Sequence, residues 1–599
     1  LSPTGNAKPF DENGDGTILG EGLGVVVLKR LDDAERDGDR VYAVLRSIGS
    51  SSDGKGEAIY APSSEGQKKA LRRAYEAADV TPDTIELLEA HGPGTARGDA
   101  VEARALNEVY GEAGREGRWC AIGSVKSQIG HTKAAAGVAG LIKTALALHY
   151  KVQPPTIKVT QPLDEFKASP LFVNALPRPW VASADHPRRA ALSAFGFGGS
   201  NFHCVLEETD SEKREADWDG QVQLFTCSAG DAEGIRRAVS GLSDITSWDA
   251  LRAAAFASRR SFDHRAGRRL AFVVERDRTE VPKLVATVGK MLDRTPDEPW
   301  STPDGIFYGV GEANGKLAMI FPGQGSQYVG MLRDLSCLFP QMLDALRDAN
   351  EAFAEGESRR LTDLIYPPPA FDDETRQRQE ADLRAIEVAQ PAIGAVSVGA
   401  FSVLRDLGVM PEAVAGHSYG ELMALCAAGS YDADALYSLS RLRAQLMASG
   451  GGDKGAMLAV RAPLHDVEQL VAEERLDVVV ANRNAPTQAV LSGAALEIER
   501  ALEACVRRKI QSKKIPVAAA FHSPLVAHAR EPFLAALREI DFSAAAIPVF
   551  ANTSAREYPT SIDEARELLA AQLASPVDFV SEILAMHDNG VRTFIEVGP

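Results

Sequence analysis

The sequence predicts an α/β protein made of two large layered units with a smaller piece between them. Short apolar strands alternate with helical stretches through residues 1–208 and again through residues 316–599, as in strand and helix layers around a core. The length of 599 residues agrees, because at roughly 150 residues per domain it allows two large units and a connecting piece. Hydrophobic residues make up 45% of the chain and charged residues 25%, which excludes disorder, collagen and coiled coil.

Residues 1–208 are expected to form a layered domain, because apolar side chains recur there at strand or helix spacing. We expect strands at 24–28, 85–90 and 202–206, and helices at 65–78 and 133–148. Residues 209–315 are more polar and contain charge-dense stretches. Their strand-like runs are short, at 222–227 and 270–274, and we interpret this segment as a folded linker domain.

A new α/β unit begins with the apolar strand 316–321 and continues to residue 599. Within it, residues from about 455 to 517 place four short strands around two helical stretches. This order, βαββαβ, predicts a ferredoxin-like insertion. The expected strands are 456–460, 478–481, 489–492 and 514–517, and the expected helices are 464–473 and 496–508.

The composition excludes several classes of partner. The formal charge is 65 − 83 = −18 and the pI is about 5.2, so nucleic acid and anionic membranes are repelled. We find no apolar run of the ~18 residues that a membrane helix needs, and no signal peptide. The six cysteines contain no CxxC pair, which predicts neither disulfides nor zinc and fits the reducing cytoplasm. Because the chain opens at Leu1 without Met and closes on an apolar strand at 594–599, we expect an internal piece of a longer polypeptide.

Two glycine-rich patterns near the start imitate ligand loops. Asp11, Asn13 and Asp15 copy the first half of an EF-hand, but the twelfth position is Gly22 instead of the required Glu. The glycines at 14–24 have the wrong spacing for a dinucleotide loop and follow no strand. We therefore expect no metal and no bound nucleotide cofactor.

The sharpest motif is GxSxG at 416–420, which follows an apolar strand and precedes an apolar helix. This context is typical of a nucleophile elbow, in which a tight turn presents a serine, here Ser418. The alternative is an inert serine at a strand-turn-helix corner.

A serine nucleophile needs a base and an oxyanion hole. His522 stands where a strand ends in a turn marked by Pro524, so it is the candidate base, although a single His is more often structural. The turn 321–327 follows the unit's first strand and offers backbone N–H groups, unless it is only a connecting turn. The pattern thus indicates an enzyme that transfers or hydrolyses acyl groups.

Further motifs follow in one order through the same unit. They are GQGSQ at 323–327, Gln390 with Pro391, GHSYG at 416–420, Arg443 in LRAQLM at 442–447, Asn482 and Asn484 in ANRNAP at 481–486, and FHSP at 521–524. Together they resemble the malonyl-CoA:acyl-carrier-protein transacylase family, in particular the acyltransferase domains of type I polyketide and fatty-acid synthases. The resemblance implies that 316–599 form an α/β-hydrolase-like acyltransferase that lacks its C-terminal end.

The resemblance also implies roles for individual residues. Ser418 becomes acylated and His522 is the base. The backbone N–H groups of Gln324 and Tyr419 hold the oxyanion. The backbone carbonyl of Gln572 orients the imidazole, so no triad acid is expected.

Arg443 separates this family from ordinary esterases, because a guanidinium in the acyl pocket can pair with a substrate carboxylate. Without the flanking motif, a helix-surface arginine would be the default interpretation. The resemblance adds Gln390, Asn482 and Phe521 to the substrate site, and Phe521 is the bulky residue that malonyl-specific members carry before the His. Ala519 departs from the pattern, since malonyl domains commonly have His there.

The first 208 residues resemble the C-terminal half of a β-ketoacyl synthase, which is a partial thiolase-like domain. The motifs are FD at 10–11 through GEG at 20–22, EAHGPGT at 89–95, GSVKSQIGHT at 123–132 and FGFGGSN at 195–201. The family pattern implies that His91 and His131 polarise a malonyl carbonyl during decarboxylation, with Lys126 in support. The nucleophilic Cys of the family lies upstream of this half, so we expect no ketosynthase activity from this chain.

Two departures, Pro93 for the usual Thr and Gln128 for the usual Asn, point to a subfamily. With AERDGD at 34–39, GSSSD at 49–53 and GHSYGEL at 416–422, the sequence is most similar to iterative synthases that make polyunsaturated fatty acids or enediyne polyenes.

The sequence thus predicts transfer of a malonyl group from malonyl-CoA, through an acyl-serine, to the phosphopantetheine thiol of an acyl carrier protein. The expected partners are the CoA thioester and the carrier protein, with no cofactor bound by this chain. In the full synthase we expect a cytoplasmic homodimer formed through the ketosynthase. The alternatives are a serine thioesterase or hydrolase, and a catalytically idle scaffold that docks a carrier protein.

Overall fold

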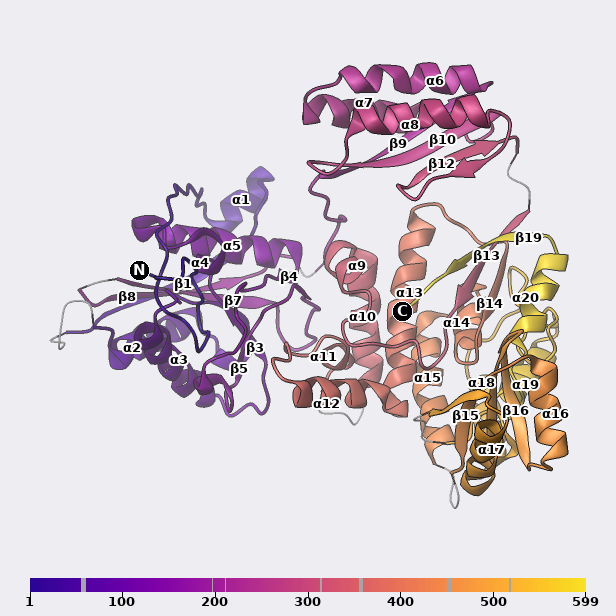
Figure 1. Ribbon diagram of the computed structural model, residues 1–599. Helices are drawn as coiled ribbons and strands as arrows, with labels where there is room; N and C mark the ends of the chain where they lie inside the picture. The colour runs from indigo at the N-terminus through magenta and orange to yellow at the C-terminus, as the bar shows by residue number, and fades with distance from the viewer. Residues whose placement is uncertain are drawn as a thin grey trace. The chain divides into compact units, whose positions relative to one another are not determined.

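The computed structural model describes residues 1–54, 61–196, 198–210, 212–312, 315–354, 359–449, 454–515 and 519–599. The chain divides into two compact units (Figure 1). The first unit contains Leu1–Ala216 together with Leu317–Pro599, and the second contains Asp217–Lys316.

The N-terminal part of the first unit is built on a six-stranded mixed sheet with the order β1-β8-β7-β2-β3-β5. β7, β2, β3 and β5 run parallel, whereas β8 is antiparallel to both of its neighbours. β2 is buried along its whole length, as expected for a central parallel strand. The strands are β1 (Val44–Ser52), β2 (Ile85–Glu89), β3 (Cys120–Gly123), β5 (Leu171–Val173), β7 (Arg189–Gly196) and β8 (Ser200–Glu207).

Helices cover both faces of this sheet. α2 (Ser64–Ala78) and α3 (Ala96–Gly111) pack on one face, and α5 (Ala136–Tyr150) lies on the other (Figure 1). α2 begins after Ser63, whose side chain accepts a hydrogen bond from the Gly66 N–H and so caps the helix. The smaller elements are α1 (Leu31–Asp37), α4 (Lys126–Ile129), β4 (Val152–Gln153), β6 (Arg178–Pro179) and the 3-10 turns Pro82–Thr84, Lys133–Ala135 and Asp164–Phe166.

The structure confirms most of the elements predicted for this part, but the strand predicted at 24–28 is wrong. These residues form no strand, and their apolar side chains are exposed: 79% at Val25 and 92% at Val27. A strand is stabilised by hydrogen bonds to a neighbouring strand, and none in the described part of the chain pairs with this segment. The helix predicted from residue 133 begins at Ala136, after a 3-10 turn.

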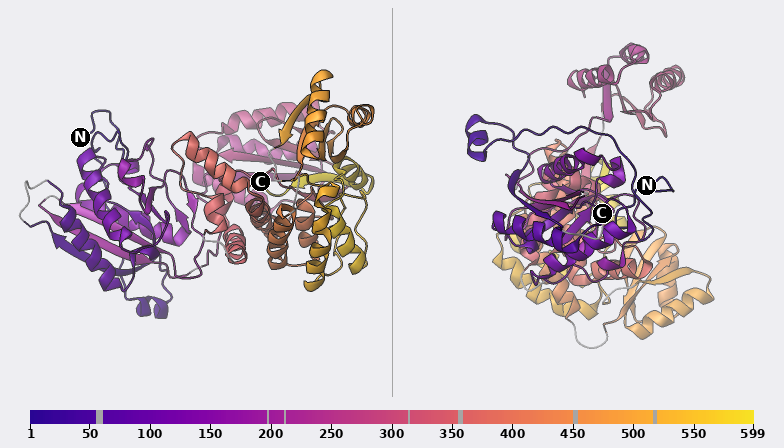
Figure 2. Two further views of the ribbon diagram at one scale, coloured as in Figure 1. Left: turned by 90° about the horizontal axis from the view of Figure 1, so that it is seen from below. Right: turned by 90° about the vertical axis from the view of Figure 1, so that its left-hand side faces the viewer.

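The second unit contains a four-stranded antiparallel sheet with the order β11-β12-β10-β9. Its helices pack on one face of the sheet, where buried and exposed residues alternate along β10 (Figures 1 and 2). The elements are β9 (Val222–Ala229), α6 (Ala232–Ser240), the 3-10 turn Gly241–Asp244, α7 (Trp248–Arg260), β10 (Arg268–Glu275), α8 (Val281–Arg294), β11 (Trp300–Ser301) and β12 (Ile306–Val310).

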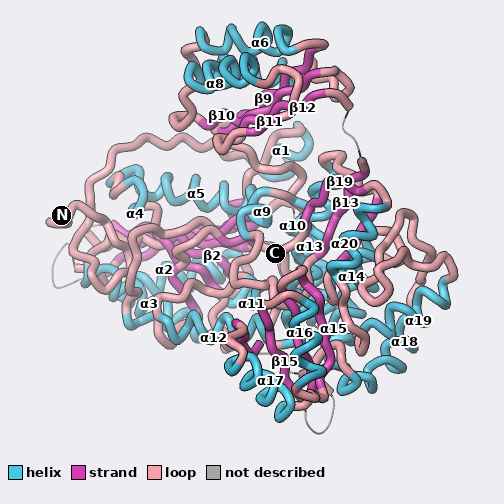
Figure 3. Tube along the Cα trace, turned by 45° about the vertical axis from the view of Figure 1, so that its right-hand side comes forward, coloured by secondary structure: helices cyan, strands magenta, loops and turns pink. Residues whose placement is uncertain are grey.

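The C-terminal part of the first unit surrounds a three-stranded sheet with the order β14-β13-β19. Figure 3 shows helices beside β13 and β19. β13 and β14 are parallel, so their carboxyl ends meet at one edge, where each strand runs into a glycine-containing turn. The strands are β13 (Lys316–Phe321), β14 (Ala413–Gly416) and β19 (Val591–Glu596). The helices are α9 (Arg333–Leu338), α10 (Pro340–Phe353), α11 (Leu361–Ile365), α12 (Asp373–Arg384), α13 (Ile386–Asp406), α14 (Gly420–Ala427), α15 (Ala433–Ala448), α18 (Arg530–Glu539), α19 (Ile562–Gln572) and α20 (Phe579–Asp588), with the 3-10 turn Pro524–Ala529.

α13 is the one helix in the described residues that is long and apolar enough to cross a membrane by length and composition. The expectation that no such stretch exists is therefore wrong. However, 83% of its apolar window is buried inside the protein, which is the environment of a core helix.

A small subdomain is inserted after α15. It contains β15 (Ala456–Arg461), α16 (Leu464–Glu473), β16 (Val478–Ala485), β17 (Gln488–Gly493), α17 (Ala495–Arg507) and β18 (Gln511–Ile515). The sheet order β16-β17-β15-β18 is antiparallel throughout, which confirms the βαββαβ arrangement predicted from the sequence. Residues 516 and 517, the predicted end of the last strand, lie outside the described residues.

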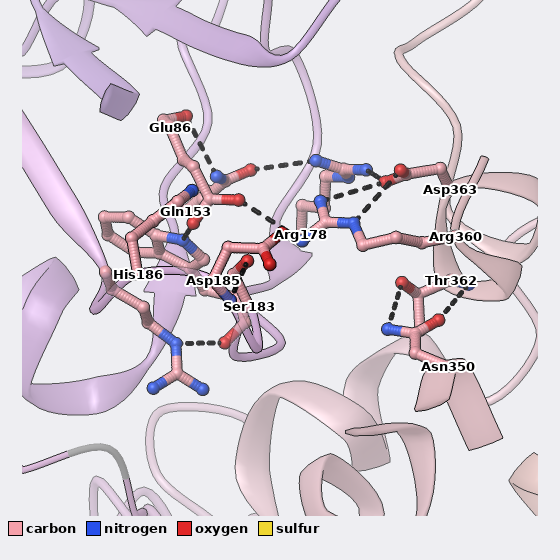
Figure 4. A network of polar contacts seen from close by, with 12 residues as sticks. Glu86, Gln153, Arg178, Ser183, Asp185, His186, Asn350, Arg360, Thr362 and Asp363 are labelled. Atoms are coloured by element: carbon pink, nitrogen blue, oxygen red, sulfur yellow. Dashed lines mark hydrogen bonds and ion pairs between the residues drawn. The ribbon is translucent and has the colours of Figure 1, made fainter. Parts of the chain in front are cut away.

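Ion pairs connect the two parts of the first unit (Figure 4). Arg178 Nη2 donates to Asp363 Oδ1 at 2.7 Å, and Arg360 pairs with Asp363 at 3.1 Å and with Glu86 at 3.2 Å. Trp180 Nε1 donates to the other oxygen of Glu86 at 2.7 Å. Burial alone would raise the pKa of Asp363, but Arg360 and Arg178 keep it below its usual value. This network fastens β6 to α11.

Candidate active site

Ser418 lies in the turn between β14 and α14, with a left-handed φ of 52°. The tightness of the turn explains its glycines. A Cβ on Gly416 would lie 2.0 Å from the backbone of Gly420, and a Cβ on Gly420 would lie 2.0 Å from the carbonyl oxygen of Phe321. The structure therefore forms the strained elbow that the sequence predicted.

His522 contacts the elbow serine directly. Ser418 Oγ and His522 Nε2 are 2.7 Å apart, and His522 Nδ1 lies 3.1 Å from the carbonyl oxygens of both Gln572 and Ser575. Because a carbonyl oxygen only accepts, Nδ1 carries the proton, and Nε2 is left to accept the serine O–H. Burial, and then the nearby Arg443, lower the pKa of His522 to about 3, so the imidazole is neutral at neutral pH.

Arg443 on α15 lies beside this pair and is 1% exposed. Its Nη1 donates to Gln390 Oε1 at 2.9 Å, and its Nη2 faces Gln572 Oε1 at 3.3 Å and Ser418 Oγ at 3.5 Å. Its Nε has no hydrogen-bond partner among the described residues. Burial lowers its pKa to about 10, so the guanidinium stays charged at neutral pH. The site thus holds a buried cation beside the serine hydroxyl.

The turn after β13 packs against the elbow, since a Cβ on Gly323 would lie 2.3 Å from the carbonyl oxygen of His417. Within the described chain, no acceptor takes a hydrogen bond from the backbone N–H of Gln324 or Tyr419. Both groups are therefore available to a substrate oxygen. The side chain of Gln324 accepts from Gln390 Nε2 at 3.1 Å, which links this turn to Arg443.

The remaining predicted substrate residues lie near the site in different ways. Gln390 on α13 is fully buried and bridges Arg443 and Gln324. Phe521 and Asn482 are also buried, at 7% and 5% exposure. Among the described residues, no hydrogen bond joins either of them to the serine, the imidazole or the guanidinium.

Sequence reasoning missed a buried polar layer beneath the elbow. Asn552 Oδ1 accepts the Ser418 N–H at 2.6 Å, and Asn552 Nδ2 donates to Glu582 Oε2 at 3.0 Å. Glu421, in the first turn of α14, accepts from the Asn552 N–H at 3.1 Å and from the hydroxyl of Tyr558. Glu421 directly follows the GxSxG motif and could have been noticed, but no local pattern marks the other three residues.

His417, the residue before the nucleophile, has a partner in the inserted subdomain. Its Nε2 lies 2.7 Å from Asn484 Oδ1, and its ring packs against Phe579 with centroids 5.5 Å apart. This contact ties the elbow to β16. Asn484 lies in the motif ANRNAP, which the sequence analysis identified, but only Asn482 of this motif was predicted to belong to the substrate site.

The N-terminal part brings its own predicted residues together. The rings of His91 and His131 are 5.6 Å apart between centroids, and Lys126 Nζ donates to the carbonyl oxygen of His91. Glu102 accepts the N–H of His91 at 2.8 Å. Burial lowers the pKa of His91 well below its ordinary value and that of His131 to about 4. Both imidazoles are therefore neutral at neutral pH.

No cysteine joins this pair of histidines by a hydrogen bond among the described residues. None of the six cysteines forms a disulfide, and burial raises the pKa of Cys204 to about 11 and that of Cys426 to about 12. Thiols in such surroundings stay protonated.

The acidic residues of the EF-hand-like stretch serve the local fold. Asp11 accepts the N–H groups of Thr160 and Gln161 at 2.5 and 3.0 Å, and Asp15 accepts the hydroxyl of Ser2 at 2.5 Å. Within the described ranges, no group of three or more His, Cys, Asp or Glu side chains is placed to hold a metal ion.

Comparison with protein families assigns most of the chain. The acyl transferase domain family matches residues 318–599, and the β-ketoacyl synthase C-terminal domain family matches residues 42–160. The ketoacyl-synthetase C-terminal extension matches 161–266, and the β-ketoacyl synthase N-terminal domain matches 1–34. The chain therefore carries an acyl transferase domain and a β-ketoacyl synthase C-terminal domain, and the ketosynthase in it is truncated.

Individual relatives refine this class. A polyunsaturated fatty acid synthase subunit of Thraustochytrium sp. is 35% identical over 99% of this chain and 22% of its own length. Polyketide synthase GfsA of Streptomyces halstedii is 33% identical over 100% of this chain and 8% of its own length. The acyltransferase domain from module 8 of the salinomycin polyketide synthase is 26% identical, with a TM-score of 0.50, over 63% of this chain and 85% of that domain. The chain thus spans less than a quarter of the length of either synthase, and its acyl transferase domain is similar to those of polyketide and polyunsaturated fatty acid synthases.

Proposed function

We propose that this chain loads malonyl groups from malonyl-CoA onto Ser418 and passes them to the phosphopantetheine thiol of an acyl carrier protein. The observation that carries the proposal is the buried guanidinium of Arg443, whose Nη2 lies 3.5 Å from the nucleophile. A cation in this position favours an acyl group with its own carboxylate.

The proposed chemistry has two matching halves. His522 Nε2 takes the proton of the Ser418 hydroxyl as Oγ attacks the thioester carbonyl, and the resulting oxyanion is held by the N–H groups of Tyr419 and Gln324. The carbon–sulfur bond then breaks, and the CoA thiolate leaves with the proton from His522. In the second half, His522 deprotonates the carrier's thiol, which attacks the acyl-serine carbonyl. The bond between the acyl carbon and Ser418 Oγ then breaks, and His522 returns the proton to Oγ.

The other predicted roles follow from this scheme. We propose that the carbonyl of Gln572 orients the His522 imidazole, and that Gln390 positions Arg443. Phe521 and Asn482 are proposed to border the acyl group. His91, His131 and Lys126 are proposed to be the ketosynthase residues that assist decarboxylation once a nucleophilic Cys is supplied.

The setting of the site is part of the same proposal. We place the chain in an iterative polyketide or polyunsaturated fatty acid synthase that is cytoplasmic and dimerises through its ketosynthase. The domain limits proposed are 1–208, 209–315 and 316–599, with the insertion at about 455–517. The 35% identity to the polyunsaturated fatty acid synthase of Thraustochytrium sp. supports this assignment.

The first test is the covalent intermediate. Intact-mass measurement after mixing with malonyl-CoA should show one malonyl adduct, which the Ser418→Ala variant lacks. Addition of a carrier protein bearing phosphopantetheine should move the adduct to the carrier. Release of free malonate instead would indicate a hydrolase, and absence of any adduct would indicate an idle scaffold.

The second test concerns the acyl group. Loss of a buried charged partner costs about 2–5 kcal/mol, so Arg443→Ala should lower malonyl loading by about 100-fold and leave acetyl loading similar or faster. Acylation rates with malonyl-CoA and acetyl-CoA measure this preference. A variant that keeps the original preference would show that another residue binds the carboxylate.

A further inference from the structure

The guanidinium of Arg443 is buried but has no carboxylate in hydrogen-bond contact among the described residues. Its acceptors are Gln390 Oε1, Gln572 Oε1 and Ser418 Oγ, all of which are neutral. An isolated cation is costly to bury, so a negative charge should lie close by. Glu421 is fully buried and lies three residues after the nucleophile, in the first turn of α14.

Gln572 joins Glu421 to Arg443 through its side-chain amide. Its Nε2 donates to the carbonyl oxygen of Ser418 at 2.7 Å and to Glu421 Oε2 at 3.3 Å, while its Oε1 accepts from Arg443 Nη2. The carbonyl of Ser418 can only accept, so the amide nitrogen must be on that side. The amide dipole is thus aligned from carboxylate to guanidinium.

Two buried acids could carry the negative charge, and the hydrogen bonds favour Glu421. It accepts from three donors: Gln572 Nε2, the Asn552 N–H and the Tyr558 hydroxyl. Glu582 accepts one hydrogen bond, from Asn552, and its Oε1 has no partner among the described residues. Donors stabilise a carboxylate, so Glu421 is the acid of the two that ionises at lower pH. Burial raises its pKa to about 7, whereas burial and Glu421 together raise the pKa of Glu582 well above its usual value.

We propose that Glu421 is a positioning residue that supplies the counter-charge of Arg443 through Gln572, and thereby sets the preference for carboxylated acyl groups. The proposal rests on the proposed function. A carboxylate in direct contact with the guanidinium would occupy the donors that the substrate needs. One intervening amide keeps Arg443 charged and leaves N–H groups of its guanidinium, including that of Nε, available to the substrate.

The test compares the acyl groups in the whole chain. Glu421→Gln keeps the size of the side chain and removes its charge, so the ratio of kcat/KM for malonyl-CoA to that for acetyl-CoA should fall about tenfold. The matched control is Glu582→Gln, which changes the other buried acid of the layer and should leave the ratio unchanged. A purely structural role for Glu421 would instead lower both kcat/KM values equally, and that result would overturn the proposal.

A double-mutant cycle separates this proposal from the proposed function. In the Arg443→Ala background, Glu421→Gln should not change the ratio further, because the charge it serves is absent. If Arg443→Ala keeps the wild-type preference, the proposed function fails. If Arg443→Ala loses the preference while Glu421→Gln retains it, only the role of Glu421 is refuted.

A second variant covers the case in which Glu421→Gln does not fold, as judged by thermal unfolding. Tyr558→Phe removes one of the three hydrogen bonds to Glu421 without changing the charge of any group that touches Arg443. The malonyl-to-acetyl ratio should fall in the same direction by about threefold. An unchanged ratio in folded Tyr558→Phe would overturn the proposal.

Discussion

The two catalytic regions of the chain differ in completeness, although both contain imidazoles that are neutral at neutral pH. In the acyltransferase region, Ser418 Oγ and His522 Nε2 are 2.7 Å apart, with a cation and two available backbone N–H groups beside them. In the ketosynthase region, His91 and His131 lie with ring centroids 5.6 Å apart, and no nucleophile among the described residues is bonded to either. A buried imidazole can polarise a substrate or take a proton, but covalent catalysis also needs a nucleophile within reach.

This difference in completeness arises because the two sites are formed from different parts of the chain. The acyltransferase site is formed by turns and helices within residues 317–599, and its groups contact each other directly. In the ketosynthase region, the family's N-terminal domain matches only residues 1–34 of this chain. The apolar side chains of Val25 and Val27 belong to that segment and remain exposed.

The largest expected effect is all-or-none: this chain should load malonyl and condense nothing. Carbon–carbon bond formation needs a thiolate to hold the growing acyl chain, and burial raises the pKa of Cys204 to about 11. After incubation with malonyl-CoA and an acyl-loaded carrier protein, mass spectrometry should detect the malonyl adduct but no β-ketoacyl product. An intact ketosynthase given the same carrier is the positive control. β-Ketoacyl product from this chain alone would show that the ketosynthase region also has a working nucleophile.

A smaller effect, about 100-fold or more, is expected from His522→Ala, because a positioned general base contributes that much to proton transfer. Single-turnover acylation by malonyl-CoA measures the rate. The matched control is His528→Ala, in the 3-10 turn that follows, whose imidazole contacts the Leu446 carbonyl at 3.0 Å and none of the reacting groups. Its rate should stay within about twofold of the wild type. Equal rates for the two variants would remove His522 from the mechanism.

The elbow and its base could be predicted because their signals are local. Glycines two residues before and after Ser418 reflect a turn that no other residue fits, and His522 stands in a short marked turn. The contact of the Gln572 carbonyl with the imidazole spans 50 residues, and only the resemblance to a family pointed to it.

The polar layer beneath the elbow could not be predicted, because its contacts are distant in sequence. Asn552 lies 134 residues from the serine whose N–H it accepts, and Tyr558 lies 137 residues from Glu421. Neither has a distinctive local pattern. The strand predicted at 24–28 was wrong for a related reason, since apolar residues form a strand only where a neighbour accepts their hydrogen bonds. The length of α13 was missed because Gln390 and Pro391 interrupt its apolar run, although the helix continues through both.

The smallest expected effect concerns the pH profile of acylation, in which we expect no fall in rate through the ordinary titration range of histidine. Burial disfavours the imidazolium and lowers the pKa of His522 to about 3, so the neutral base persists as the pH falls through the ordinary histidine range. An exposed base with a pKa of about 6.5 would lose about tenfold in rate between pH 7.5 and 5.5, whereas acylation here should change by less than about twofold. Acetyl-CoA is the donor for this measurement, because it lacks the carboxylate that Arg443 and Glu421 are proposed to serve. A rate that falls with a midpoint near pH 6.5 would show that water reaches the imidazole in solution, and the lowered imidazole pKa would then hold for the ketosynthase histidines alone.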